Sequence, residues 1–118
     1  MKKIVTMCSQ GLCRSVGMAD VLKLHFEPVD VIPMGYRGNT EETQHMLFDW
    51  ADLIIIMETH MMKNVPESHH DKTFVCDVGP DTYGGKNIGR RVLLIGQCWR
   101  WLRENAEKLG IMEHSKKL

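Results

Sequence analysis

The chain has 118 residues, which is enough for one domain with a hydrophobic core of its own. Its 15 basic and 15 acidic side chains give a formal net charge of zero, which excludes a broad positive field for nucleic acid or a membrane surface. No apolar stretch is long enough for a bilayer span or a signal peptide, so we expect a cytoplasmic chain with no membrane partner and with its four cysteines reduced.

The first half of the chain alternates between strand and helix patterns. A strand is expected from Lys3 to Met7, followed by a helix from Ser15 to about Phe26 and a short strand from Val29 to Pro33. Thr40 is a residue type that caps helices, and a second helical pattern begins after it. The side chains of this second helix that are predicted to face the core are Met46, Leu47 and Trp50.

The second half continues the alternation. The unbroken apolar run from Leu53 to Met57 is typical of a strand buried on both faces. The elements expected after it are a short helix at Thr59 to Asn64, a polar loop at Pro66 to Lys72, a strand at Thr73 to Cys76, a Gly-, Pro- and Asp-rich loop at Asp77 to Asn87, a long helix at Gly89 to Leu109, and a loose tail at Glu113 to Leu118. Gly110 is a residue type that ends helices.

Strands that alternate with helices predict right-handed crossovers and a parallel sheet. We therefore expect an α/β fold of three layers in a single domain, residues 1–118, with a four-stranded parallel sheet between helices. Such sheets bind ligands beyond the carboxyl ends of their strands. The segments that follow the first and fourth strands, residues 8–14 and 77–87, are predicted to lie at this same edge.

The most informative segment is Cys-Ser-Gln-Gly-Leu-Cys-Arg-Ser, residues 8–15, which we call the site loop; it joins the first strand to the first helix. The backbone N–H groups of such a loop and the positive end of the helix dipole bind an oxyanion. Cys8 opens the loop, where we expect the pKa of its thiol to fall below the usual value of about 8.5. Arg14 can hold two phosphate oxygens in a planar fork. The site loop therefore predicts a thiolate nucleophile beside an anion site.

The site loop resembles the signature of the low-molecular-weight protein tyrosine phosphatase family, Cys-x-Gly-Asn-x-Cys-Arg-Ser. Cys8, Cys13, Arg14 and Ser15 match it, whereas residues 10 and 11 depart from its Gly-Asn pair. The departure is tolerable because glycine adopts the left-handed backbone of the family's asparagine without steric cost. The resemblance implies that Cys8 attacks phosphorus and that Arg14 holds the phosphoryl oxygens. The substrate-binding residues that it implies are Ser9, Gln10, Gly11, Leu12, Cys13 and Ser15.

A phosphate ester also needs a proton for its leaving oxygen, which a positioned carboxylic acid supplies. Residues 77–87, which we call the acid loop, include Pro-Asp-Thr-Tyr-Gly at 80–84, similar to the family's Asp-Pro-Tyr motif. The resemblance implies that Asp81 is the general acid and that Tyr83 lines the substrate cleft. Asp77, at the end of the fourth strand, is the rival acid. Glu58 stands where the family often has an aspartate after its third strand, and we expect a structural role for it.

The resemblance implies a phosphatase that acts on a phosphotyrosine protein or a small aryl phosphate through a cysteinyl-phosphate. It implies no metal and no other cofactor, no nucleic-acid partner, and a monomer or weak dimer. His69 and His70 are adjacent, but no cysteine or carboxylate stands at metal-ligand spacing beside them, so a solvated loop is the favoured interpretation.

Three other functions remain open. Arsenate reductases share Cys-x5-Arg-Ser but need two further relay cysteines, and Cys76 and Cys98 are expected in a strand and a helix. Phosphocarrier domains of sugar transport also carry phosphate on cysteine, but they lack the arginine at position 14. A module that binds phosphotyrosine or phosphocysteine without turnover is the third alternative.

Overall fold

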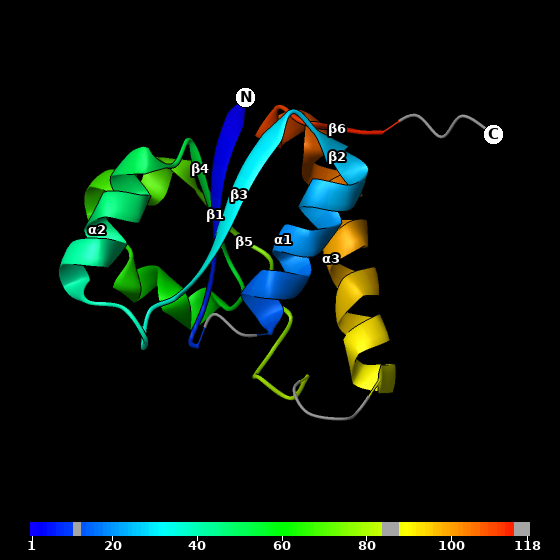
Figure 1. Ribbon diagram of the computed structural model, residues 1–118, viewed down its shortest axis with the longest axis horizontal. Helices are drawn as coiled ribbons and strands as arrows, with labels where there is room; N and C mark the ends of the chain where they lie inside the picture. The colour runs from blue at the N-terminus through cyan, green and yellow to red at the C-terminus, as the bar shows by residue number, and fades with distance from the viewer. Residues whose placement is uncertain (11–12, 84–87, 115–118) are drawn as a thin grey trace.

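The computed structural model describes residues 1–10, 13–83 and 88–114. Its main sheet has four parallel strands in the order β3-β1-β4-β5 (Figure 1). The strands are β1 (Lys2–Cys8), β3 (Val29–Gly35), β4 (Leu53–Ile56) and β5 (Thr73–Val75). The four-stranded parallel sheet predicted from the alternating pattern is confirmed.

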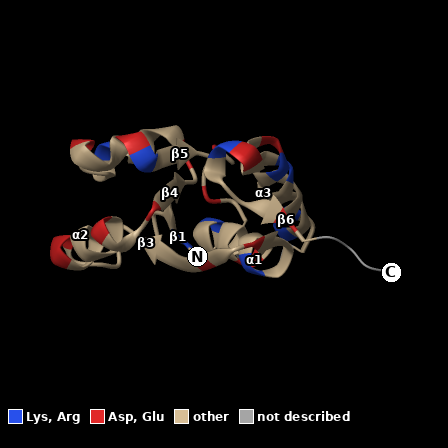
Figure 2. Cartoon of the chain, turned by 90° about the horizontal axis from the view of Figure 1, so that it is seen from above, with Lys and Arg blue, Asp and Glu red and all other residues tan. Residues whose placement is uncertain are grey.

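Helices cover both faces of this sheet. The helices α1 (Arg14–His25) and α3 (Ile88–Leu109) pack together on one face. The helix α2 (Glu41–Trp50) lies on the other, with the 3₁₀ helices η1 (Thr59–Asn64) and η2 (Glu67–Lys72) (Figure 2). The three predicted layers are therefore present.

The two central strands form the middle of the core. Ile54, Ile55 and Ile56 of β4 are fully buried, as are Ile4 and Val5 of β1. Apolar side chains point to both faces because helices cover both, so the strands are apolar throughout rather than alternating. Packing on both faces also holds β1 rigidly in the sheet. The last residue of β1 is Cys8, the predicted nucleophile.

The sequence-based account of α2 was right about its start and wrong about one core residue. Thr40 caps the helix, and its Oγ1 accepts a hydrogen bond from the Thr43 amide at 3.2 Å. Met46, predicted to face the core, is 63% exposed, and Phe48 is fully buried instead. Leu47 and Trp50 are partly buried against the core. The helical period alone could not decide between Met46 and Phe48, because the face that meets the sheet is narrow.

Two further expectations were wrong. The segment predicted as a loop, Pro66 to Lys72, contains the 3₁₀ helix η2. The expected loose tail, Glu113 to Leu118, is ordered at its first residue: Glu113 belongs to β6 (Met112–Glu113), which pairs with β2 (Phe26–Glu27) in a separate antiparallel sheet. Glu113 also accepts a hydrogen bond from Trp99 Nε1 at 2.8 Å, so the middle of α3 holds the start of the tail. Residues 115–118 lie outside the described part.

The site loop and the acid loop leave the same edge of the sheet (Figure 1). β1 lies between β3 and β4, and the chain crosses from β1 to β3 through α1 but from β3 to β4 through α2, on the opposite face. The carboxyl end of β1 is thus the switch point at which ligands of such sheets bind. Within the described residues, no helix combines the length and the apolar character needed to cross a membrane.

Candidate active site

Cys8 ends β1 with its side chain 1% exposed, at the start of the site loop. Its Sγ lies 3.2 Å from the hydroxyl oxygen of Ser15, which is buried in the first turn of α1. The Cys8 carbonyl accepts a hydrogen bond from the Tyr36 amide at 3.1 Å, and the Ser9 carbonyl accepts one from the Arg37 amide at 2.9 Å. The thiol is therefore fixed between the end of the sheet and the start of a helix. Gly11 and Leu12, two of the predicted phosphate-binding residues, lie outside the described part, and Gln10 is exposed.

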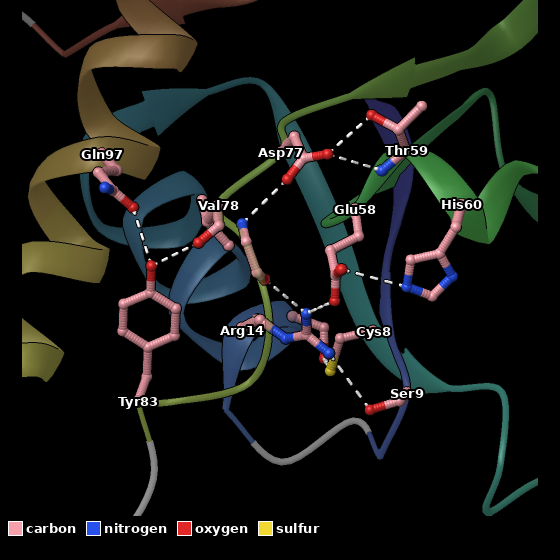
Figure 3. A network of polar contacts seen from close by, with 12 residues as sticks. Cys8, Ser9, Arg14, Glu58, Thr59, His60, Asp77, Val78, Tyr83 and Gln97 are labelled. Atoms are coloured by element: carbon pink, nitrogen blue, oxygen red, sulfur yellow. Dashed lines mark hydrogen bonds and ion pairs between the residues drawn. The ribbon is translucent and has the colours of Figure 1, made fainter.

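Arg14 is the first residue of α1 and is 2% exposed. Its Nη1 donates hydrogen bonds to the Glu58 carboxylate and, at 2.8 Å, to the Gly79 carbonyl. Its Nη2 donates to the hydroxyl of Ser9 at 3.2 Å. Figure 3 shows the guanidinium between Glu58 on one side and Cys8 and Ser9 on the other.

One nitrogen of this guanidinium is left over. Arg14 Nε is buried and has no hydrogen-bond partner among the described residues. A buried donor without an acceptor costs about 1–3 kcal/mol, and more when it carries charge. An anion bound at the site loop would supply the missing acceptor. Of the features described here, this orphaned donor points most directly to a ligand.

Asp77 follows β5 and binds two backbone segments. Its carboxylate accepts hydrogen bonds from the Thr59 amide at 3.0 Å, the Thr59 hydroxyl at 2.7 Å and the Gly79 amide at 2.9 Å. The Thr59 bonds, followed by the bond from Gly79, lower the pKa of Asp77 below its usual value. Gly79 has a φ of +80°, a conformation that glycine adopts without steric cost. Asp77 thus braces the turn of the acid loop.

Asp81 and Tyr83 are placed very differently. Asp81 is exposed, whereas Tyr83 is 2% exposed. The Tyr83 hydroxyl donates to the Val78 carbonyl at 2.5 Å and lies 3.2 Å from Gln97 Oε1. Burial raises the pKa of Tyr83. The Tyr83 side chain packs inward and anchors the acid loop to α3, and its place in a substrate cleft stays a prediction. Residues 84–87 lie outside the described part.

The contact between Glu58 and Arg14 was not predicted from the sequence. Glu58 follows β4, and its two carboxylate oxygens have different partners: Oε1 pairs with Arg14, and Oε2 lies 3.1 Å from His60 Nε2. The structural role expected for Glu58 did not include Arg14, which is 44 positions away in the chain. The only available signal was that β1 and β4, both apolar throughout, would be neighbours whose carboxyl ends meet.

Comparison with known proteins adds the fold. No protein-family model and no curated protein matches the chain. Among solved structures, the YwlE arginine phosphatase from Geobacillus stearothermophilus is 18% identical with a TM-score of 0.63 and covers 100% of both chains. Wzb from Vibrio vulnificus, in complex with benzylphosphonate, is 14% identical with a TM-score of 0.57 and covers 87% of this chain and 98% of its own. A YwlE mutant from Bacillus subtilis is 16% identical with a TM-score of 0.60, over 90% and 99%.

The chain has the low-molecular-weight phosphatase fold. The neighbours YwlE and Wzb are members of the low-molecular-weight protein tyrosine phosphatase family. The resemblance drawn from the site loop is thereby confirmed at the level of fold, although the sequence identity is low.

The other three cysteines have distinct environments. Cys13 is half-buried and lines a groove between α1 and α3, together with Asp20 and Arg91. Cys76 and Cys98 are both buried and hydrogen-bonded to each other, although one follows β5 and the other lies in α3. This hydrogen bond and burial raise the pKa of the Cys76 thiol. A buried thiol with a raised pKa, such as Cys76, is poorly suited to relay a disulfide, because the thiolate is the reactive form.

Among the residues that the structure describes, no group of three or more His, Cys, Asp or Glu side chains could hold a metal ion. His69 lies 3.0 Å from the Asp49 carboxylate, and His70 Nε2 lies 2.7 Å from the Val65 carbonyl. The adjacent histidines therefore serve to hold η2 against its neighbours.

Proposed function

We propose that this chain is a phosphomonoester hydrolase in which Cys8 is the nucleophile. The observation that carries the proposal is the buried Arg14 guanidinium, which lies beside Cys8 at a helix N-terminus and whose Nε has no hydrogen-bond partner in the described part of the chain. The shared fold with known phosphatases supports it.

The first half of the reaction transfers the phosphoryl group to sulfur. The Cys8 thiolate attacks phosphorus in line with the ester oxygen, and the phosphorus–oxygen bond breaks as the sulfur–phosphorus bond forms. Arg14 and the amides of the site loop hold the non-bridging oxygens, and donors placed in this way are each worth about 10²–10³ in rate. Asp81 gives its proton to the leaving oxygen.

The second half regenerates the thiol site. Water attacks the phosphoryl group on Cys8, and the Asp81 carboxylate takes a proton from that water. The sulfur–phosphorus bond breaks, inorganic phosphate leaves, and the Ser15 hydroxyl donates a hydrogen bond to the departing thiolate at the 3.2 Å separation of Sγ and Oγ. The charge is balanced by Arg14 and the loop amides, so the proposal involves no metal and no cofactor.

The choice of Asp81 over Asp77 rests on their surroundings. The lowered pKa of Asp77 keeps its carboxylate ionised at neutral pH, and its oxygens already accept three hydrogen bonds. Asp81 is exposed at the tip of the acid loop, which Gly79 joins to Arg14. An exposed carboxyl two residues after the Gly79 contact with Arg14 is better able to meet a substrate than one engaged in a turn.

Two substrate classes follow from different observations. The site-loop and acid-loop motifs favour an aryl phosphate such as phosphotyrosine. Two of the matching solved structures are named arginine phosphatases, and Tyr83 is too buried to stack on a tyrosyl ring, which makes phosphoarginine the second candidate. A comparison of kcat/KM on one peptide carrying either phosphotyrosine or phosphoarginine decides between them.

Hydrolysis of p-nitrophenyl phosphate at mildly acidic pH tests the proposal. We expect turnover by the wild-type chain and none above background by Cys8→Ser, whereas Cys98→Ala, which removes another buried thiol, should remain active. Turnover by Cys8→Ser at the wild-type rate would overturn the proposal. Binding of phosphate without hydrolysis by the wild type would favour the non-hydrolytic binding module.

A further inference from the structure

The Glu58 carboxylate lies against the guanidinium that binds substrate in the proposed function, and two roles are conceivable. It could compete with the substrate by occupying Arg14 as an internal anion, or it could hold Arg14 in the orientation that substrate needs. The two roles predict opposite effects on anion binding when the side chain is removed.

The distribution of contacts favours the second role. Glu58 and the Gly79 carbonyl both accept from Nη1, whereas Nη2 is directed to Ser9 in the site loop and Nε has no partner within residues 1–10, 13–83 and 88–114. An anion that binds Nε and Nη2 would replace only the weak 3.2 Å contact with Ser9. It would leave the contacts at Nη1 intact. Glu58 therefore need not move when substrate enters.

The same contacts link Glu58 to the acid loop. Nη1 of Arg14 donates to the Gly79 carbonyl, the Gly79 amide donates to Asp77, and Asp77 accepts from Thr59, which follows Glu58 in the chain. Figure 3 shows these contacts as a ring that joins the start of α1 to the segments that follow β4 and β5. The orientation of Arg14 is thus set by two other loops as well as by its own helix.

We propose that Glu58 is a positioning residue for the anion site: its carboxylate, held from the other side by His60, keeps Arg14 turned with Nε and Nη2 available to the phosphoryl group. This inference rests on the proposed function, because it assigns the guanidinium the phosphate as its ligand. The Glu58 side chain contacts Arg14 and His60 at the same time. It is only 17% exposed, which limits competition by water for these contacts.

His60 holds Glu58 from the other side. Its Nε2 lies 3.1 Å from Glu58 Oε2, whereas Oε1 pairs with Arg14, so the carboxylate is held between the two side chains. Because His60 is 51% exposed, water competes for this contact, and its effect on phosphate binding should be smaller than that of Glu58.

Protection of Cys8 from iodoacetamide by inorganic phosphate measures binding without turnover. We expect Glu58→Ala to weaken phosphate binding by about tenfold, because an unrestrained guanidinium must be ordered by the ligand. Glu58→Gln should bind within about threefold of wild type or more tightly, since the amide oxygen still accepts from Nη1 while one opposing charge is gone. The matched control is Asp49→Asn, which removes a carboxylate paired with a histidine at 3.0 Å away from the site.

The outcomes are distinguishable. Tighter binding by both Glu58 variants would show a competing anion and overturn the inference, and so would unchanged binding by Glu58→Ala. Failure of phosphate to protect the wild-type chain would overturn the proposed function and this inference with it.

His60→Ala, at a half-exposed position, guards against a Glu58→Ala chain that does not fold. It removes the 3.1 Å contact with Glu58 and should bind phosphate about threefold more weakly than wild type, because Glu58 is then held from one side only. His45→Ala, also about half-exposed, should bind phosphate as wild type does. Unchanged phosphate binding by His60→Ala would overturn the role of His60.

Discussion

Asp77 and Asp81 lie four positions apart, and their surroundings suit them to different tasks. Asp77 accepts three hydrogen bonds and has a lowered pKa, whereas Asp81 is exposed beyond a glycine turn. Two carboxyl groups of the same residue type can have different roles, one as a general acid and one structural, when their surroundings differ in this way. At the residue scale, the first prediction therefore concerns this pair.

Asp81→Asn should lower kcat on a phosphotyrosyl peptide by roughly 10²–10³, which is about 3–4 kcal/mol of barrier. The loss should be smaller on p-nitrophenyl phosphate, because its phenolate leaves without protonation. Asp77→Asn should cost much less on either substrate. Steady-state kinetics with both substrates checks this order, and a leaving-group dependence seen only for Asp77→Asn would show that the acid has been misassigned.

Cys13 is the second residue-scale case. It is half-buried at the N-terminal end of α1, close in sequence to the nucleophile, and the family resemblance implies that it can form a reversible disulfide with Cys8. We expect peroxide to inactivate the chain and dithiothreitol to restore it, because a disulfide spares Cys8 from irreversible oxidation. Cys13→Ser should recover only in part. Full recovery of that variant after the same peroxide dose would refute a protective role.

At the scale of elements, the acid loop depends on one carboxylate. The pKa of Asp77 is lowered in the folded chain from its ordinary value of 3.8, so its stabilising effect is present above about pH 4 and is lost as pH falls through the lowered pKa. Because the side chain is exposed, we expect Asp77→Asn to cost less than about 1 kcal/mol at pH 7.

Urea unfolding at pH 7 and at pH 3 checks this dependence. The difference in free energy of unfolding between wild type and Asp77→Asn should shrink at the lower pH. A gap for Asp77→Asn that widens on acidification would contradict the sign.

The helix α2 offers a matched pair of core and surface positions. Phe48 is fully buried and Met46 is 63% exposed. Phe48→Ala should lower the free energy of unfolding by about 3–5 kcal/mol, since it removes a packed ring and leaves a cavity. Met46→Ala should stay within about 0.5 kcal/mol of wild type. Chemical denaturation measures both, and equal losses would mean that α2 packs by another face.

At the scale of the whole molecule, the sequence predicts what is local or periodic. The apolar runs predict β1, β4 and the parallel sheet. Thr40 predicts the start of α2, and Gly110 predicts the end of α3, where its φ is +73°. The site loop could be recognised because its eight residues are contiguous.

The remainder depends on contacts between distant parts of the chain. The pairing of β2 with β6 joins segments of only two residues each, too short for any periodicity. The contacts of Glu58 with Arg14 and of Asp77 with Thr59 link residues 44 and 18 positions apart. Such contacts form only because particular strands become neighbours in the sheet. The sequence pattern therefore identifies these residues as candidates but does not predict their contacts.

The measurement that tests the central claim most directly is detection of phosphate on Cys8 during turnover. The wild-type chain is mixed with p-nitrophenyl phosphate, quenched in acid within the first turnover, and mapped by peptide mass spectrometry. The account predicts a phosphorylated peptide that contains Cys8, more strongly populated in Asp81→Asn, where hydrolysis of the intermediate is slowed, and absent in Cys8→Ala. Rapid turnover with phosphate on another residue, or undiminished turnover by Cys8→Ala, would contradict it.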